Sequence, residues 1–442
     1  MSVINLFNTA VLVFVLSLSP FISRSQQIYF PPPNNTDWVV TSPESLGWCT
    51  DKIAPLYNFL ESNNTKAFIV LKDGKIVLEK YFGTFTADSL WYWASAGKTM
   101  TGMLAGIAKV EGYLKLDTAV SAYLGKGWTS CPPEKEALIK VRNQLTMTTG
   151  LDDRVSDPDC TSPSCLQYLA DAGTRWAYHN APYSMLNPLI TAATGIDFKT
   201  YFNSMIRNKI GMNGLWVNLN YNHIYFSTAR SFAKFGLLLL AKGTWNGTPI
   251  LSDTAYLRAL TNTSQNLNKS YGQLTWLNGK QSYMLPQSQF VFPGPLCPDA
   301  PAEMYAAMGK NGQLINVVPS KGLIMIRMGN APGSQFEVPN AYNNQIWQQL
   351  NMVICNPTGS SEATVSKEPY EIYPNPANTE INIVPGEASK YFSTFLLNLN
   401  GQLVQKYGNQ RILDVSTVPP GNYLLIIISN GTKFMSKISI IR

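Results

Sequence analysis

Hydrophobic and polar residues follow strand-like and helix-like patterns in different parts of the chain. Two apolar runs on either side of Asp73-Gly74 predict a β-hairpin with strands at 67–71 and 75–81. From Ser95 to about Leu114, apolar residues recur at helical spacing, which predicts a long helix with Ser95 as its N-cap. Further helices are predicted at 49–60, 227–243 and 340–352.

Strand-like patterns return towards the end of this part of the chain, at 271–277, 304–308, 313–318 and 322–328. The region between the Ser95 helix and these strands carries helical signals and few strand signals. Antiparallel strands from both ends of a domain can pair in one sheet. We therefore predict an α+β domain over 26–355, with an antiparallel sheet, flanking helices and an inserted helical region.

The C-terminal part of the chain has a different pattern. Residues 356–369 are small and polar without periodicity, which is typical of a linker. Short alternating runs follow over 370–442, and Asn-Gly pairs at 400–401 and 430–431 indicate hairpin turns. This segment is predicted to form a small all-β sandwich.

Composition fits a globular protein of two or three domains. The chain has 442 residues, of which 45% are hydrophobic and 14% charged. Its formal charge is +7, but lysine and arginine are scattered and form no dense run. Nucleic-acid binding needs basic residues clustered on one face, so we expect no nucleic-acid partner.

The N-terminus has the features of a signal peptide. An apolar run at 10–18 is too short to span a bilayer, and small residues near Arg24 suit a cleavage point. We therefore assign 1–25 to a signal peptide, with a retained anchor helix as the alternative. No later stretch is long and apolar enough to span a membrane, so we expect no transmembrane span in the mature chain.

Six cysteines suit an exported protein. Histidine is scarce and C-x-x-C pairs are absent, so we expect neither a metal site nor a cofactor. Six oxidised cysteines allow 15 pairings. Cys160 and Cys165 flank a short loop and form the easiest pair, and Cys49 and Cys355 lie near the ends of the main domain. Elimination then pairs Cys131 with Cys297.

A serine and a lysine lie one helical turn apart at Ser95 and Lys98. Serine is a weak nucleophile that needs an adjacent base. Lysine can be that base if burial or a nearby cation lowers its pKa from about 10.4 towards about 7–8. The chain repeats the spacing at Ser231 and Lys234, inside the predicted helix 227–243, where a structural role is simpler.

Further polar motifs distinguish Ser95 from Ser231. Tyr178-x-Asn180 offers a phenol and an amide, and Lys310-Asn311-Gly312-Gln313 lies at the turn of a predicted hairpin. Ser-x-x-Lys, Tyr-x-Asn and Lys-x-Gly in this order resemble the motifs of penicillin-recognising serine hydrolases. The segments 141–151, 227–252 and 312–319 also resemble stretches of this family. The likeness covers about residues 45–353 and is strongest to the class C β-lactamase-like group, which also includes esterases, D-aminopeptidases and oligoamide hydrolases.

The resemblance implies a β-lactamase/transpeptidase-like fold and a role for each motif. Ser95 would be acylated, with Lys98 and Tyr178 sharing the base role and Asn180 orienting Lys98 or the substrate amide. Lys310 would lower the pKa of both bases. The backbone N–H groups of Ser95 and Gln313 would form the oxyanion hole, beside Asn311 and Gly312.

Rival interpretations remain for the substrate and the mechanism. Asn311 stands where β-lactamases usually have threonine, and His179 replaces a small residue. The substrate is therefore expected to be a small-molecule ester, amide or peptide, with a β-lactam or a D-Ala-D-Ala peptide as the alternatives. A non-catalytic binding protein that kept the fold is the rival from another class. A Ser-His-Asp triad is not expected, because Ser95 lacks the G-x-S-x-G elbow.

The tail has a resemblance of its own. The motifs at 373–378, 400–402, 413–416, 420–423 and 437–442 resemble a type IX secretion sorting domain. This implies the type IX machinery as a partner and a secreted or outer-surface location, with the tail removed or the enzyme anchored. A carbohydrate-binding or adhesive β-module is the alternative.

Overall fold

The computed structural model describes residues 28–33, 37–332, 338–355, 370–385, 392–398, 403–429 and 432–442. The predicted signal peptide, the predicted linker and the two Asn-Gly turns at 400–401 and 430–431 lie outside these residues.

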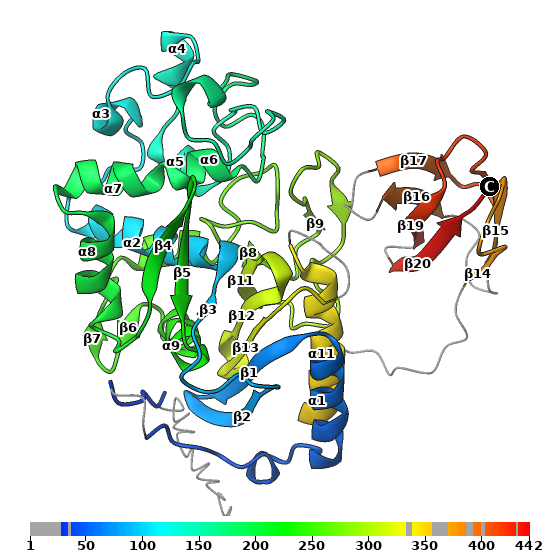
Figure 1. The fold of residues 1–442 in the computed structure, drawn as a ribbon, viewed down its shortest axis with the longest axis horizontal. Coiled ribbons are helices and arrows are strands. Elements are labelled where there is room, and N and C mark those ends of the chain that lie inside the picture. The colour runs from blue at the N-terminus through cyan, green and yellow to red at the C-terminus, as the bar shows by residue number, and fades with distance from the viewer. Residues whose placement is uncertain are drawn as a thin grey trace, which may run out of the picture.

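A six-stranded antiparallel sheet forms the centre of the larger domain (Figure 1). Its order is β2-β1-β13-β12-β11-β8, so the N-terminal hairpin pairs with strands from the far end of the domain, as the sequence predicts. The strands are β1 (Thr65–Lys72), β2 (Lys75–Tyr81), β8 (Trp276–Leu277), β11 (Tyr305–Gly309), β12 (Gln313–Val318) and β13 (Leu323–Gly329). The predicted strand 271–277 is wrong in length, because only its last two residues join the sheet.

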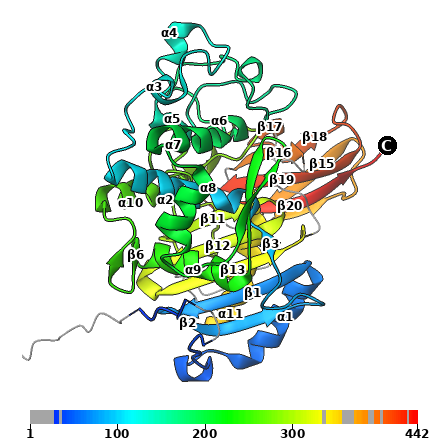
Figure 2. The ribbon, with the colours of Figure 1, turned by 60° about the vertical axis from the view of Figure 1, so that its left-hand side comes forward.

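Helices cover both faces of this sheet (Figures 1 and 2). On one face lie α1 (Ile53–Ser62) and α11 (Asn340–Ile354). On the other lies α9 (Ala229–Leu240), whose Gly236 meets the sheet so closely that a Cβ there would lie 2.9 Å from Ile315 and Ile324. Neighbouring residues of β12 point to opposite faces of the sheet. Ile315 faces Gly236 of α9, whereas the Asn316 amide donates to Asn343 Oδ1 of α11 at 2.9 Å.

The 14-residue helix α2 (Gly97–Val110) and the shorter helices of the inserted region lie above the sheet (Figure 1). The shorter helices are α3 (Ser121–Leu124), α4 (Pro133–Glu136), α5 (Val141–Leu145), α6 (Asn180–Ser184), α7 (Leu186–Thr194), α8 (Phe198–Phe202) and α10 (Thr254–Leu260). Strands are few between α2 and β8, as the sequence predicts, and the two longest, β4 and β5, belong to a second sheet with the order β3-β5-β4 that the sequence analysis did not assign. Its strands are β3 (Trp91–Tyr92), β4 (Leu215–Leu219) and β5 (Asn222–Ser227), and two minor pairs join β6 (Thr244–Trp245) to β7 (Thr248–Pro249) and β9 (Ser282–Tyr283) to β10 (Phe292–Pro293).

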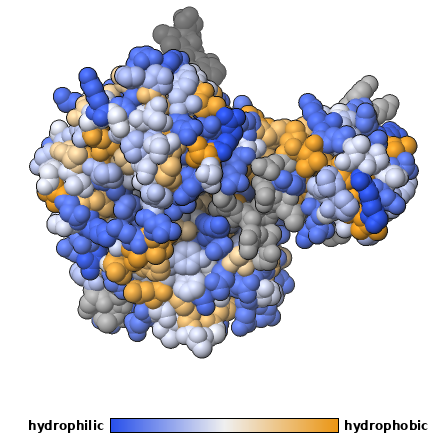
Figure 3. Space-filling model, turned by 45° about the horizontal axis from the view of Figure 1, so that its top comes forward, coloured by the Kyte–Doolittle hydropathy of each residue, from blue (hydrophilic) through white to orange (hydrophobic). Residues whose placement is uncertain are grey.

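The C-terminal domain consists of two antiparallel sheets around one small core. One sheet holds β14 (Tyr370–Tyr373), β15 (Glu380–Pro385) and β18 (Ile412–Asp414), and the other β16 (Ser393–Asn398), β17 (Leu403–Gly408), β19 (Gly421–Ser429) and β20 (Thr432–Ile440). Phe395 of β16 points away from that core and meets Phe290 of the larger domain, with ring centroids 5.3 Å apart. On the face drawn in Figure 3 this domain projects from the larger one.

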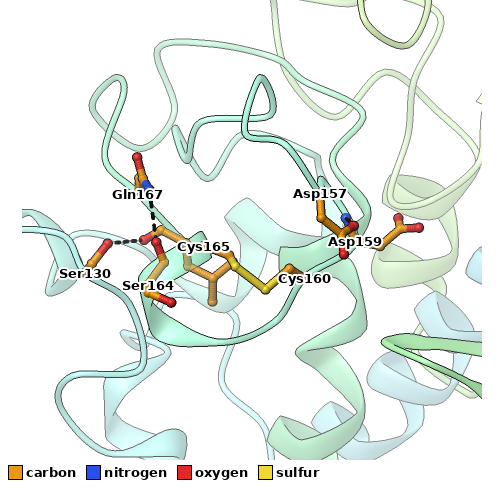
Figure 4. Close-up of a disulfide and its surroundings, with 8 residues drawn as sticks. Ser130, Asp157, Asp159, Cys160, Ser164, Cys165 and Gln167 are labelled. Carbon is orange, nitrogen blue, oxygen red and sulfur yellow. Dashed lines mark hydrogen bonds between the residues drawn. A yellow bond between two sulfur atoms is a disulfide. The ribbon is translucent and has the colours of Figure 1, made fainter.

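The cysteines confirm two of the three expected pairs. One disulfide joins Cys49 to Cys355. A second joins Cys160 to Cys165 and is drawn in Figure 4. The pairing of Cys131 with Cys297 is wrong, because both are buried free thiols. Each has its own surroundings: the Cys131 thiol faces a carbonyl of the inserted region, and the Cys297 thiol contacts α11. No helix among the described residues is long and apolar enough to cross a membrane.

Candidate active site

Ser95 lies in a short 3₁₀ turn, Ala94–Ala96, immediately before α2. The prediction that Ser95 caps this helix is wrong, because Ala96 is the N-cap residue and no side chain caps the helix. The turn is fixed instead by the buried Trp93, whose backbone N–H donates to the Tyr225 carbonyl at 2.8 Å and whose indole N–H donates to Ser227 Oγ at 2.8 Å. The Ser95 hydroxyl is therefore left to face Lys98.

Lys98 connects Ser95 to the Tyr-x-Asn motif. It is the second residue of α2, and only 4% of the residue is exposed. Nζ donates to Ser95 Oγ at 3.2 Å and to Asn180 Oδ1 at 2.8 Å. It also lies 5.2 Å from the ring centroid of Tyr178 and 4.0 Å from that of Tyr183. The amine is thus placed to exchange a proton with the serine hydroxyl.

Two tyrosines flank Lys98 in different surroundings. Tyr178 is half-buried and its ring stacks on Trp276, with centroids 5.5 Å apart. Tyr183 lies one turn further along, in α6, where its hydroxyl pairs with Thr101 Oγ1 at 3.2 Å. Burial raises the pKa of Tyr183 to about 12, against a smaller lowering by Thr101. Burial therefore favours the neutral phenol at Tyr183, whose hydroxyl is already paired with Thr101.

The turn after β11 carries the third predicted motif. Lys310 is exposed and Asn311 and Gly312 have φ angles of 64° and 79°. The fully buried Arg327 holds this turn, since its guanidinium donates to the Asn311 carbonyl at 2.6 Å and the Gly312 carbonyl at 3.1 Å. The Asn311 amide donates to the Tyr92 hydroxyl at 2.8 Å and is thereby engaged within the protein.

The end of β11 is pressed against the serine turn. A Cβ on Gly309 would lie 2.4 Å from the Trp93 carbonyl oxygen, so only glycine allows this approach. Gln313 begins the next strand, and its buried side chain both donates to the Gly329 carbonyl, at 2.7 Å, and accepts from the Gly329 N–H, at 3.1 Å. This side chain is therefore engaged in the sheet, which leaves only the backbone of Gln313 for a substrate.

Five of the eight predicted residues line one pocket of about 220 Å³: Ser95, Lys98, Tyr178, Asn180 and Lys310. Asn311, Gly312 and Gln313 follow Lys310 in its turn but do not line the pocket. The sequence analysis missed the remaining lining residues, which are Ala94, Asp153, Pro158, Asp159, Tyr183, Asn222, His223, Ile224 and Gln287. Among them, Asp159 next to Cys160 had a visible signal, since a disulfide fixes the loop on which it lies.

The second Ser-x-x-Lys pair is structural. Lys234 is completely buried in α9, and its Nζ donates to the carbonyls of Pro32, Pro33 and Gly211 at 2.7–3.2 Å. Burial lowers the pKa of Lys234 to about 8. Ser231 exchanges hydrogen bonds with Asn213 instead of with Lys234. The amine and hydroxyl here hold loops together and face no pocket given above.

Comparison with known proteins separates the chain into two parts. A family model described as Beta-lactamase matches residues 64–346, and one described as Secretion system C-terminal sorting domain matches 371–441.

Solved structures share the fold at low sequence identity. A protein of Bacteroides dorei assigned as a beta-lactamase is 16% identical, with 70% of this chain and 100% of that chain covered and a TM-score of 0.56. One of Bacillus anthracis assigned as a 6-aminohexanoate-dimer hydrolase is 17% identical, with 75% and 91% covered and a TM-score of 0.56. A penicillin-binding protein homologue from Caulobacter crescentus is 16% identical, with 70% and 98% covered and a TM-score of 0.52.

Proposed function

Because the chain belongs to the beta-lactamase family, we propose that it is an exported serine hydrolase that forms a covalent acyl-enzyme on Ser95. The predicted fold, a β-lactamase/transpeptidase-like domain followed by a small all-β domain, is confirmed. The single observation that supports the mechanism best is the contact of the buried Lys98 amine with both Ser95 Oγ and Asn180 Oδ1.

The reaction would proceed in two halves. Lys98, in its neutral form, takes the proton of Ser95 as Oγ bonds to the carbonyl carbon of an ester or amide. Tyr178 returns a proton to the leaving group as the carbonyl–leaving-group bond breaks. Water then attacks the acyl-enzyme carbonyl and gives its proton to the Tyr178 phenolate, and Lys98 returns its proton to Ser95 Oγ as the acyl–Oγ bond breaks and the acid leaves. The backbone N–H groups of Ser95 and Gln313 would stabilise the negative oxygen in both halves.

The substrate we favour is an ester, amide or peptide. By resemblance, β-lactamases have at the position of Asn311 a residue that helps to hold the carboxylate of the antibiotic. In this chain the Asn311 amide donates to the Tyr92 hydroxyl instead. The lining of the pocket includes the amine of Lys310 and the carboxylates of Asp153 and Asp159. Of the solved structures named above, the one from Bacillus anthracis is assigned to hydrolysis of an amide dimer.

The C-terminal domain is a secretion-system sorting domain and implies a secretion machinery as partner and a surface or extracellular location. We propose that this machinery is type IX, that residues 1–25 direct passage through the inner membrane, and that residues 356–369 join the two domains.

The test is covalent labelling of the full chain with a fluorophosphonate, read by peptide mass spectrometry. We expect an adduct on Ser95 and its complete loss in Ser95→Ala. Ser231→Ala is the matched control, since it removes the other serine of the same spacing and should keep the adduct. A folded wild-type chain without an adduct on Ser95 would favour the non-catalytic rival.

The substrate class is tested by kcat/KM for nitrocefin, a short p-nitrophenyl ester, a D-Ala-D-Ala peptide and an oligoamide. Preference for nitrocefin would contradict the reading of Asn311 given above.

A further inference from the structure

Asp159 is a pocket carboxylate outside the three motifs of the proposed mechanism. Its two oxygens accept from two different amides: Oδ1 from Asn180 Nδ2 at 2.8 Å, and Oδ2 from Asn222 Nδ2 at 2.9 Å. Asn180 in turn accepts from Lys98 Nζ at 2.8 Å. A continuous chain of hydrogen bonds therefore runs from Asp159 through Asn180 to Lys98 and Ser95.

The chemistry of these groups fixes the direction of the chain. An asparagine amide can present either its oxygen or its NH₂ group to a neighbour, and rotating the amide exchanges the two. An ionised carboxylate only accepts, so Asp159 takes the NH₂ group of Asn180. The amide oxygen of Asn180 is then turned towards Lys98, which donates to it. In the neutral form that the proposed mechanism requires, the Lys98 amine can also accept, so without Asp159 the reversed amide would find a partner there as well.

The loop that presents Asp159 is fixed from both sides (Figure 4). Before it, the Pro158 carbonyl accepts from the Ala181 N–H at 3.1 Å, next to Asn180 itself. The backbone N–H of Asp159 donates to the Asp157 carboxylate at 3.0 Å. After it, Cys160 is joined to Cys165. These contacts explain how a loop residue keeps a defined place against the Tyr-x-Asn motif.

We propose that Asp159 is a positioning residue that sets the orientation of Asn180 and, through it, holds Lys98 against Ser95. This inference rests on the proposed function. It concerns one carboxylate that acts through another side chain, and it assigns Asp159 no bond to the substrate.

The experiment measures the second-order rate of Ser95 labelling by the fluorophosphonate in the full chain, together with Tm. Asp159→Ala should slow labelling about 10- to 100-fold, the equivalent of a lost hydrogen bond to a charged group. Asp157→Asn is the matched control: it removes a charge from the same loop but keeps an oxygen for the Asp159 N–H, and we expect no change in rate.

A rescue variant separates orientation from folding. In Asp159→Asn alone, the new amide can turn either way, so Asn180 can reverse and labelling slows. Adding Asn222→Asp supplies a carboxylate that accepts only, which takes the NH₂ group of the new asparagine and turns its oxygen towards Asn180. The double variant should therefore recover most of the rate lost in the single one.

Several outcomes overturn the proposal. The first is an Asp159→Ala chain that is labelled at the wild-type rate. The second is an Asp159→Ala chain whose Tm is lowered while its labelling rate per folded molecule is unchanged. The third is a double variant that is labelled no faster than Asp159→Asn alone. Absence of labelling in the folded wild-type chain contradicts the proposed function and this role with it. Labelled wild type with an unaffected Asp159→Ala contradicts only the role of Asp159.

Discussion

We expect His179 to make the hydrolase domain less stable in mild acid. It lies between Tyr178 and Asn180, is 2% exposed, and neither ring nitrogen has a hydrogen-bond partner among the residues that the structure describes. Burial lowers its pKa to about 4, while Asp153 acts in the raising direction and Arg175 in the lowering one. The imidazole is thus buried as a neutral ring, and folding opposes its protonation.

The sign and size of the effect follow from the two pKa values. In the unfolded chain the pKa returns to about 6.5, so between pH 6.5 and 4 the unfolded state binds a proton that the folded state does not. Stability is therefore complete above pH 6.5 and falls as the pH drops towards 4. Between pH 7.5 and 5 the loss is about 2 kcal/mol. In a domain of roughly 300 residues this lowers Tm by about 3 °C.

The assay is calorimetry of the full chain at several pH values, for wild type and His179→Leu. Leucine fills a similar space without a titrating group, so the wild type should lose about 2 kcal/mol more than the variant between pH 7.5 and 5. The chain has one other histidine, His223, whose pKa is also lowered by burial, so His223→Gln should reduce the pH dependence by less than His179→Leu does. Parallel pH profiles for wild type and His179→Leu would refute the reasoning.

Three further substitutions test contacts around the site. Gly309→Ala should slow Ser95 labelling by about 100-fold, because its Cβ would displace the serine turn at Trp93; the labelling rate measures this. Arg327→Met should destabilise the hydrolase domain by about 3 kcal/mol, since carbonyls of the Asn311 turn lose their buried donor; denaturant unfolding measures this. Replacing Cys160 and Cys165 together with serine should slow labelling roughly tenfold by loosening the Asp159 loop, with the rate again as readout.

Each of these predictions has a separate control or contradicting result. A Gly309→Ala chain labelled at the wild-type rate would show that the serine turn tolerates displacement. If Arg327→Met unfolds at the same denaturant concentration as the wild type, the Asn311 turn is stable without the Arg327 hydrogen bonds. For the loop disulfide, the matched pair is Cys49→Ser with Cys355→Ser, which should lower Tm and leave the labelling rate unchanged; equal rates in both disulfide variants would contradict the loop argument.

Local patterns were enough to predict the central sheet and the serine–lysine pair. Strand β12 lies where the strand-like apolar run placed it, and Ser95 and Lys98 meet because a helical turn brings i and i+3 together. The sheet β3-β5-β4 escaped prediction because most of β4 is exposed and β5 carries polar residues, so neither has a clear buried face. The N-cap assignment of Ser95 failed for a related reason: a serine before a helix has the same local pattern whether it caps the helix or faces a lysine.

Long-range contacts could not be predicted from spacing. Asp159 reaches Asn180 only through the fold of its loop, and no periodicity relates the two positions. Elimination paired Cys131 with Cys297 on the assumption that every cysteine is oxidised, whereas each is buried separately, and burial raises the pKa of the Cys297 thiol to about 12. A buried thiol of this kind behaves as a small apolar side chain.

The Cys49–Cys355 disulfide determines how the end of the hydrolase domain would respond to removal of the sorting domain. Cys355 directly follows the last residue of α11, so any cut within 356–369 leaves the bridge intact. Terminal helices ordinarily fray and offer a starting point for exopeptidases. After such a cut, the new chain end would still be covalently joined to Cys49, four residues before α1, across 306 residues of sequence, which in chain-entropy terms is worth about 6 kcal/mol. The cut domain would therefore keep its last helix tied to the segment that leads into its first.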